Sequence, residues 1–126
     1  MDTLFPQQPP EKEEGNKEYK RYLLWDSQKK RCSEIDFINR RASQMLYRLL
    51  EGNGKAVYLI GVDDNGKIYS LNQNDLNETI RYIKLISRKI GACVKVIRIY
   101  KNQVCSVRII LDKEILENKM ENMKLY

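Results

Sequence analysis

The residues with the clearest chemistry are basic side chains spaced for single faces of helices. Asn77, Arg81, Lys84 and Arg88 recur at steps of four, three and four residues, which places them on one side of a helix. A second row holds Arg40, Arg41, Gln44 and Arg48, and a third basic group is Lys29, Lys30 and Arg31 in a polar loop. Phosphate oxygens accept hydrogen bonds from such rows, and released counterions supply affinity. These nine basic residues are the predicted RNA-binding site, although either row alone is equally typical of an ordinary solvent-exposed helix face.

The charge distribution supports a polyanionic partner. The chain has 126 residues and a net charge of +6, but residues 1–16 carry one lysine and four acids. The remainder therefore carries about +9, and the pI is near 9.2, as expected of a nucleic-acid-binding domain. A lysine-rich surface that only keeps the protein soluble is the alternative. Tyr22, Trp25, Tyr47 and Tyr69 could stack on bases, but aromatics at such positions more often belong to the core or to hairpin pairs.

Catalytic chemistry is poorly represented in this sequence. Histidine, the commonest general base and metal ligand, is absent. Cys32, Cys93 and Cys105 lack the C-x-x-C spacing, and the last two fall on predicted strands, where cysteine behaves as a small core residue. We therefore expect no enzyme activity, no metal site and no cofactor.

One stretch imitates a phosphate-binding loop. "EGNGKAVYLIGVDDNGKIYSL" runs from Glu51 to Leu71, but Gly54-Lys55 is followed by alanine where a phosphate loop has serine or threonine. A helical pattern precedes Gly52 and a strand pattern follows Lys55, which is the reverse of the required order. We predict no nucleotide site here, and a helix that ends at Gly52 in a left-handed conformation.

The remaining patterns define the elements that would position the basic rows. Residues 1–16 hold all three prolines and predict an acidic arm that is disordered or becomes ordered on a partner. Strands are predicted over 18–25, 56–62, 67–71, 92–100 and 104–111, with a type I′ turn at Asn65-Gly66. One helix begins at Ser33 and buries Ile35, Ile38, Ala42, Met45 or Leu46, and Leu49. A second begins near Asp75, buries Leu76, Ile80, Ile83 and Ile90, and ends at Gly91; residues 112–126 form a short helix or tail capped by Asp112.

The order β-α-β-β-α-β-β indicates an α+β fold. Two helices on one face of a mainly antiparallel sheet form a two-layer sandwich, and a ferredoxin-like split β-α-β with one extra strand is the leading topology. Residues 17–111 are then a single domain. The odd, scattered cysteines and the lack of a signal peptide or membrane span predict a cytoplasmic monomer with reduced thiols.

The stretch "QMLYRLLEGNGKAVYLIGVDDNG" (44–66) resembles the region ahead of the GTPase domain in the GTP-binding-protein-one family of translational GTPases. "EEGNKEYKRYLL" (13–24) resembles the start of the same region, and the likeness extends over roughly residues 13–100. Residues 1–126 contain no phosphate loop or switch regions, so GTP hydrolysis does not carry over. What the resemblance implies is a surface that meets the ribosome.

As a free-standing chain, the protein also resembles a microsporidian ribosome dormancy factor. That resemblance implies binding to rRNA and ribosomal proteins in the tRNA exit (E) site, near the L1 stalk. The leading expectation is a hibernation factor that blocks translation sterically. The alternatives are a protein-interaction adaptor and an in-trans regulator of a translational GTPase.

Overall fold

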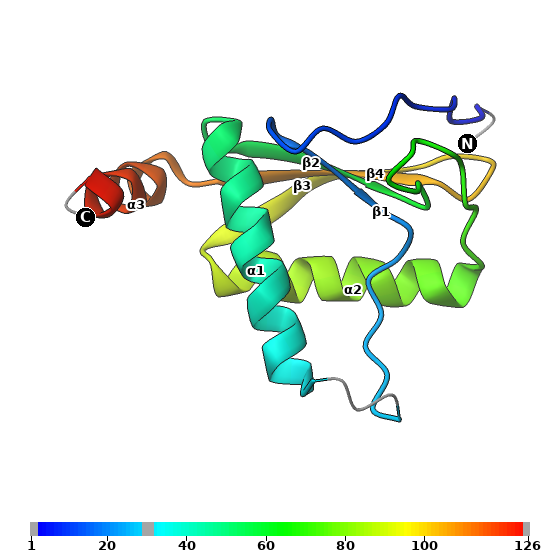
Figure 1. The fold of residues 1–126 in the computed structure, drawn as a ribbon, viewed down its shortest axis with the longest axis horizontal. Coiled ribbons are helices and arrows are strands. Elements are labelled where there is room, and N and C mark those ends of the chain that lie inside the picture. The colour runs from blue at the N-terminus through cyan, green and yellow to red at the C-terminus, as the bar shows by residue number, and fades with distance from the viewer. Residues whose placement is uncertain (1–2, 29–31, 125–126) are drawn as a thin grey trace.

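A computed structural model describes residues 3–28 and 32–124 of the chain. Its elements follow the order β1 (Lys17–Lys20), α1 (Glu34–Glu51), β2 (Lys55–Ile60), α2 (Gln73–Lys89), β3 (Ala92–Ile99), β4 (Cys105–Leu111) and α3 (Lys113–Lys124). The four strands form one mixed sheet (Figure 1). The predicted α+β class is confirmed.

The sheet has the strand order β1-β2-β4-β3. β1 runs parallel to β2, whereas β4 is antiparallel to both β2 and β3. The predicted strand over 67–71 does not form, and only a single bridge joins Val62 to Ile68. The split β-α-β topology is therefore wrong: β1-α1-β2 is an unsplit parallel unit, because β4 occupies the free edge of β2 along its whole length.

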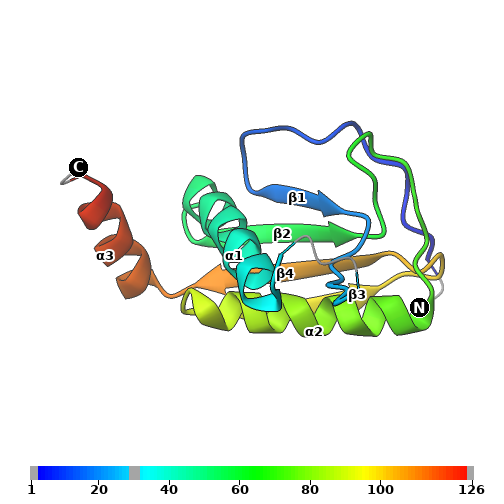
Figure 2. The same ribbon diagram turned by 60° about the horizontal axis from the view of Figure 1, so that its bottom comes forward.

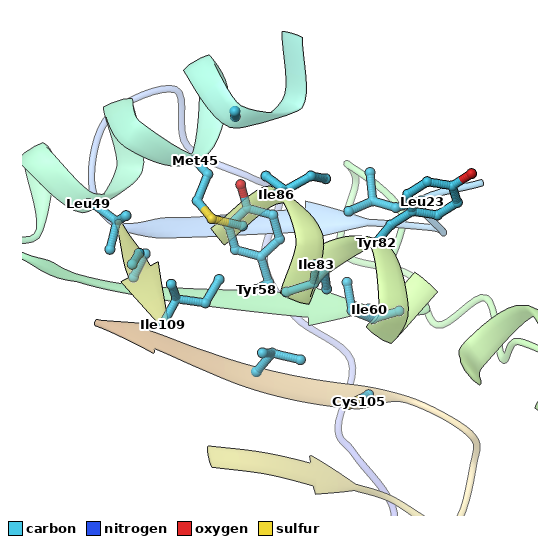
Figure 3. Packing of buried hydrophobic residues seen from close by; sticks show 14 of the residues in the cluster. Leu23, Met45, Leu49, Tyr58, Ile60, Tyr82, Ile83, Ile86, Cys105 and Ile109 are labelled. Carbon is cyan, nitrogen blue, oxygen red and sulfur yellow. The ribbon is translucent and has the colours of Figure 1, made fainter. Parts of the chain in front are cut away.

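Both long helices lie on one side of the sheet, and the N-terminal segment lies on the other (Figure 1). The main core lies between helices and sheet, where Met45, Leu49, Ile83 and Ile86 point toward Tyr58, Ile60 and Ile109 (Figure 3). These side chains are almost completely buried. Alternate residues of each strand face this core, and the others face the opposite side.

Local capping signals fix where the helices begin. Ser33 Oγ accepts a hydrogen bond from the Asp36 amide at 3.1 Å, as its capping box predicts. α2 begins earlier than expected, because Asn72 rather than Asp75 is its N-cap; Asn72 Oδ1 accepts from the Asp75 amide at 2.8 Å. Gly91 follows α2 with a φ of 77°, in agreement with its predicted role.

The apolar stripe of α1 is rotated from the predicted one. Ile35 is 67% exposed, whereas Phe37 is buried and packs edge-on against Tyr82 of α2 at 5.3 Å between ring centroids. Gly52 is not left-handed, since its φ is −98°; the left-handed residues are Asn53 and Gly54. Glycine is needed at position 52 for space, because a Cβ there would lie 1.8 Å from the Lys55 carbonyl oxygen.

The Asn65-Gly66 turn forms, but not as type I′. Only Gly66 has a positive φ, of 90°. The Gly66 amide donates to the Asp63 carbonyl at 2.8 Å, and the Asp63 amide donates to Lys67 at 2.9 Å. This pattern is a tight turn followed by one left-handed glycine.

The N-terminal arm is packed on the domain, whereas its composition predicts disorder. Asn102 holds Phe5 through two hydrogen bonds of 3.1 Å to its backbone, and the Phe5 ring meets Tyr100 edge-on at 4.8 Å. The Gln8 amide donates to Gly66 at 3.0 Å. The arm thereby covers part of the second sheet face over the small cluster of Tyr19, Leu59, Val62 and Val104.

The C-terminal helix α3 leads away from the end of β4 (Figure 2). Asp112 caps it as expected, because its Oδ1 accepts from the Glu114 amide at 2.9 Å. Leu116 anchors the helix in the main core. Among the described residues, no helix is long and apolar enough to cross a membrane.

Candidate nucleic-acid interface

The basic row on α2 lies on the surface. Arg81, Lys84 and Arg88 are all exposed, opposite the buried Ile83 and Ile86, so the predicted helix register is confirmed. Arg81 is ion-paired with Glu78, with 3.0 Å between its Nε and Oε1, and its guanidinium lies 4.7 Å from the Tyr82 ring centre. Lys84 and Arg88 form no ion pair with any described residue. These two cations are free to meet an anionic partner.

The basic row on α1 does not lie on one surface. Arg40 is exposed, but Arg41 is half-buried with its guanidinium 5.3 Å from the Phe37 ring centre. The Nε of Arg41 is buried and has no hydrogen-bond partner among the described residues. α1 also crosses α2 steeply (Figure 1), so the two rows do not form parallel tracks. The predicted group at Lys29, Lys30 and Arg31 lies outside the described residues.

Arg48 is a buried structural residue, which corrects its predicted place on the RNA-binding surface. It is 4% exposed, and its Nε donates to Glu18 Oε1 at 2.9 Å. Its two terminal nitrogens donate at 2.9 to 3.1 Å to backbone carbonyls of the arm, those of Lys12, Glu13, Glu14 and Gly15. A guanidinium has five N–H donors in a fixed fork. Arg48 uses that fork to hold the arm, so none of it reaches a phosphate.

Glu11 is the second charged group of this cluster. Its carboxylate accepts a hydrogen bond from the Tyr19 amide. It also lies 4.0 Å from Arg48 Nη2, but that nitrogen donates to the Lys12 carbonyl at the shorter distance of 2.9 Å. Burial, with the neighbouring Glu18 carboxylate adding to it, raises the pKa of Glu11 from 4.5 to about 7. The folded protein therefore binds a proton here more tightly than the unfolded chain does.

This shift predicts that the fold becomes more stable on mild acidification. A carboxyl with a raised folded-state pKa favours folding as the pH falls through that pKa, with the effect complete near its unfolded value. We expect the melting temperature to rise as the pH falls from about 8 to about 5.5, a range set by the two pKa values. Glu11→Gln should flatten this rise, and Glu13→Gln, at an exposed position of the arm, should not. Equal profiles for wild type and Glu11→Gln would contradict the assignment.

Three of the four candidate stacking aromatics gather beside the start of α1. Tyr22, Trp25 and Tyr69 line one groove with Arg40 and Arg41. Tyr22 and Tyr69 are 40% and 43% exposed, and their ring centroids lie 6.3 Å apart. Trp25 is oriented by a 3.0 Å hydrogen bond from its Nε1 to the Cys32 carbonyl. Tyr47 lies elsewhere, and its hydroxyl donates to the Glu13 carbonyl at 3.1 Å.

The described residues offer no cluster of three metal-binding side chains. Cys105 is buried, and burial raises the pKa of its thiol to about 11, which suppresses the reactive thiolate. Cys93 is exposed, although the sequence predicts a core residue. The reason is that it lies on the face of the sheet away from the helices.

Sequence reasoning missed the basic residues that the strands carry. Lys17, Lys55, Arg98 and Arg108 come from four different strands, yet all are exposed on the sheet face away from the helices. Each is isolated in the sequence, so no row or run draws attention to it. Only strand alternation could have signalled a shared face, and that requires the strand register.

Known proteins match the chain over part of its length. GTP-binding protein 2 of Mus musculus and that of Homo sapiens are each 38% identical over 93 residues, which is 74% of this chain and 14% of the relative. Uncharacterized protein R625 of Acanthamoeba polyphaga mimivirus is 33% identical over 87 residues, 68% of this chain and 43% of that protein. The chain thus spans less than half the length of these relatives. No protein-family model and no solved structure matches it.

The match to GTP-binding protein 2 covers most of the chain and supports the expected relation to GTP-binding-protein-like GTPases. The finer likeness to a ribosome dormancy factor stays a prediction. The comparison relates the chain to a segment of a larger GTP-binding protein.

Proposed function

We propose that this protein is a non-enzymatic ribosome-binding factor that occupies a tRNA site and keeps ribosomes idle. The E site near the L1 stalk is the proposed location, and rRNA with adjacent ribosomal proteins is the proposed partner. The mechanism is steric: a folded domain held by phosphate contacts excludes tRNA. The observation that carries the proposal is the exposed row of Arg81, Lys84 and Arg88 on a rigid helix, within a domain of strong net positive charge.

The relation to GTP-binding protein 2 supports a role near the translation machinery, because the family resemblance is to translational GTPases. The absence of histidine and the inert setting of Cys105 support a binding function over catalysis. Occupancy of a site needs affinity and shape, and neither requires a reactive group.

An in-trans regulator of a translational GTPase is the second candidate. It is favoured by one observation: the similarity covers a piece of GTP-binding protein 2 amounting to 14% of that protein. A domain of this kind could act on a GTPase supplied by another chain. Such a protein would follow the GTPase and not the ribosome when the two are separated.

The test replaces Arg81, Lys84 and Arg88 by glutamine, whose helix propensity is close to that of lysine and arginine. Each exposed change should alter stability by less than about 0.5 kcal/mol. Ribosome affinity should fall strongly, because up to three phosphate contacts are lost. The salt slope of binding, log Kd against log salt between about 50 and 200 mM, should shrink by up to about three units. Ribosome co-sedimentation in sucrose gradients measures both.

A charge-matched control replaces the exposed Lys12, Lys67 and Lys101 by glutamine. This control removes the same charge from the arm and the turns, so it lowers affinity only through long-range steering. Equal losses in the two variants would mean that net charge alone holds the ribosome. A wild-type chain that does not sediment with ribosomes or subunits at low salt would refute the proposed function, and comigration with a GTPase would favour the alternative.

A further inference from the structure

The face of the sheet away from the helices carries aligned cations. Across the sheet, Lys17 of β1 lies beside Val57 of β2. Val57 in turn lies beside Arg108 of β4, and Arg108 lies beside Val96 of β3. Lys55 lies two residues before Val57 on β2, and Arg98 lies two residues after Val96 on β3. Neighbouring strands are about 4.8 Å apart and residues two apart along a strand about 6.8 Å. The four cations therefore share one compact surface.

This surface has no internal counter-charge. The four strands contain six basic residues and one acid, Glu18, and Glu18 faces the helices, where Arg48 binds it. Lys17, Lys55, Arg98 and Arg108 form no ion pair with any described residue. Acids border the face at its ends: Glu14 lines one hollow with Lys17, and Asp112 and Glu117 lie near the start of α3.

The surface is also concave, and the N-terminal arm leaves it uncovered. Two adjoining hollows of about 350 and 550 Å³ share Lys55 and Ile110 in their walls. The first also contains Val57 and Arg108, and the second reaches Cys93 and Lys95. Val96 is 42% exposed beside them. The N-terminal arm covers only the neighbouring part of this face, over Tyr19 and Leu59, so the apolar floor and its cations are open.

We propose that this open face, formed by Lys17, Lys55, Arg98 and Arg108 around Val57, Ile110 and Val96, binds the sugar-phosphate backbone of unpaired RNA. Charge complementarity identifies the occupant: four unpaired cations over an acid-free floor suit a chain of phosphates. The floor has no aromatic side chain, so it provides no stacking platform of the kind that reads bases. Binding here is therefore independent of base sequence. This RNA site deepens the proposed ribosome-binding function, on which it rests for the identity of its RNA.

The experiment compares two glutamine triples in the 126-residue chain. One changes Lys55, Arg98 and Arg108, and the other is the charge-matched control triple of Lys12, Lys67 and Lys101. The probe is a fluorescein-labelled oligouridylate of about 12 nucleotides, a length typical of single-strand binding surfaces. The sheet triple should weaken oligouridylate binding at least tenfold and reduce its salt slope by about two units, since single strands contribute about 0.7 per phosphate contact. The control triple should leave this affinity within about twofold, because it removes the same charge but spares the sheet contacts.

The outcomes separate this inference from the proposed function. Unchanged oligouridylate binding by a folded sheet triple overturns the inference, even when the α2 triple of Arg81, Lys84 and Arg88 still weakens ribosome co-sedimentation. Oligouridylate binding through the sheet, in a wild-type chain that never sediments with ribosomes, sustains the inference and refutes the proposed function. Tighter binding of a polyglutamate peptide than of oligouridylate identifies an acidic protein partner and overturns the RNA assignment. If the sheet triple does not fold, Arg98→Gln alone, on edge strand β3, must still weaken oligouridylate binding for the inference to hold.

Discussion

Replacing Arg48 by methionine is expected to lower the free energy of unfolding by about 3–5 kcal/mol, because it leaves a buried charge without its partner. Glu18 is 2% exposed and would lose the guanidinium that lies 2.9 Å away. Four arm carbonyls would lose their hydrogen bonds from Arg48 as well, and only that of Glu13 keeps a side-chain donor among the described residues, the Tyr47 hydroxyl. Lys20 Nζ, at 3.4 Å from Glu18, offsets part of the loss. Small domains have only about 5–15 kcal/mol of stability in all, so the effect is readily measured by urea denaturation.

Two comparisons isolate the cause of this loss. Arg40→Met, at an exposed position on the same helix, should cost less than about 0.5 kcal/mol. Glu18→Gln combined with Arg48→Met should recover part of the loss, because no buried charge then remains unpaired. Trypsin should cleave after Lys12 faster in Arg48→Met than in wild type, since Arg48 holds the arm backbone. Equal stability of Arg48→Met and wild type would show that the Arg48 cluster contributes nothing.

Gly66→Ala is expected to cost about 2–3 kcal/mol. A left-handed backbone costs a non-glycine residue about 1–2 kcal/mol, and the φ of Gly66 is 90°. A Cβ at this position would also lie 1.9 Å from the Gln8 carbonyl oxygen, so the arm must move away. That movement breaks the 3.0 Å hydrogen bond from the Gln8 amide to Gly66, worth about 1 kcal/mol.

Gly15→Ala is the matched control, because Gly15 has a φ of 91° and nothing within 4 Å of the added Cβ. It should show the backbone cost alone. The difference between the two variants, measured by chemical denaturation, reports how strongly the arm is docked. If Gly66→Ala costs no more than Gly15→Ala, the contact between the arm and the 63–66 turn makes no contribution to stability.

The two rows of basic residues show where helical periodicity predicts side-chain exposure correctly and where it does not. On α2 the helical repeat correctly predicts that Arg81, Lys84 and Arg88 are exposed. This helix has one buried face, and the three residues lie opposite it. On α1 the same repeat predicts Arg48 on the surface, and it is buried. The difference is a distant segment: the arm folds back over the end of α1 and encloses the guanidinium.

What the sequence by itself determines about this protein is local. Ser33 and Gly91 mark helix ends because capping is settled within one turn of backbone, and the turn at Gly66 forms because only glycine relieves its left-handed conformation. The tertiary structure decides what depends on distant partners. The pairing of β4 with β2 excludes a strand at 67–71, Glu18 and the arm bury Arg48, and four cations separated along the chain meet on one sheet face. Hydrogen-bond partners across a sheet and the burial of a charge are set by segments tens of residues apart, so no local pattern contains them.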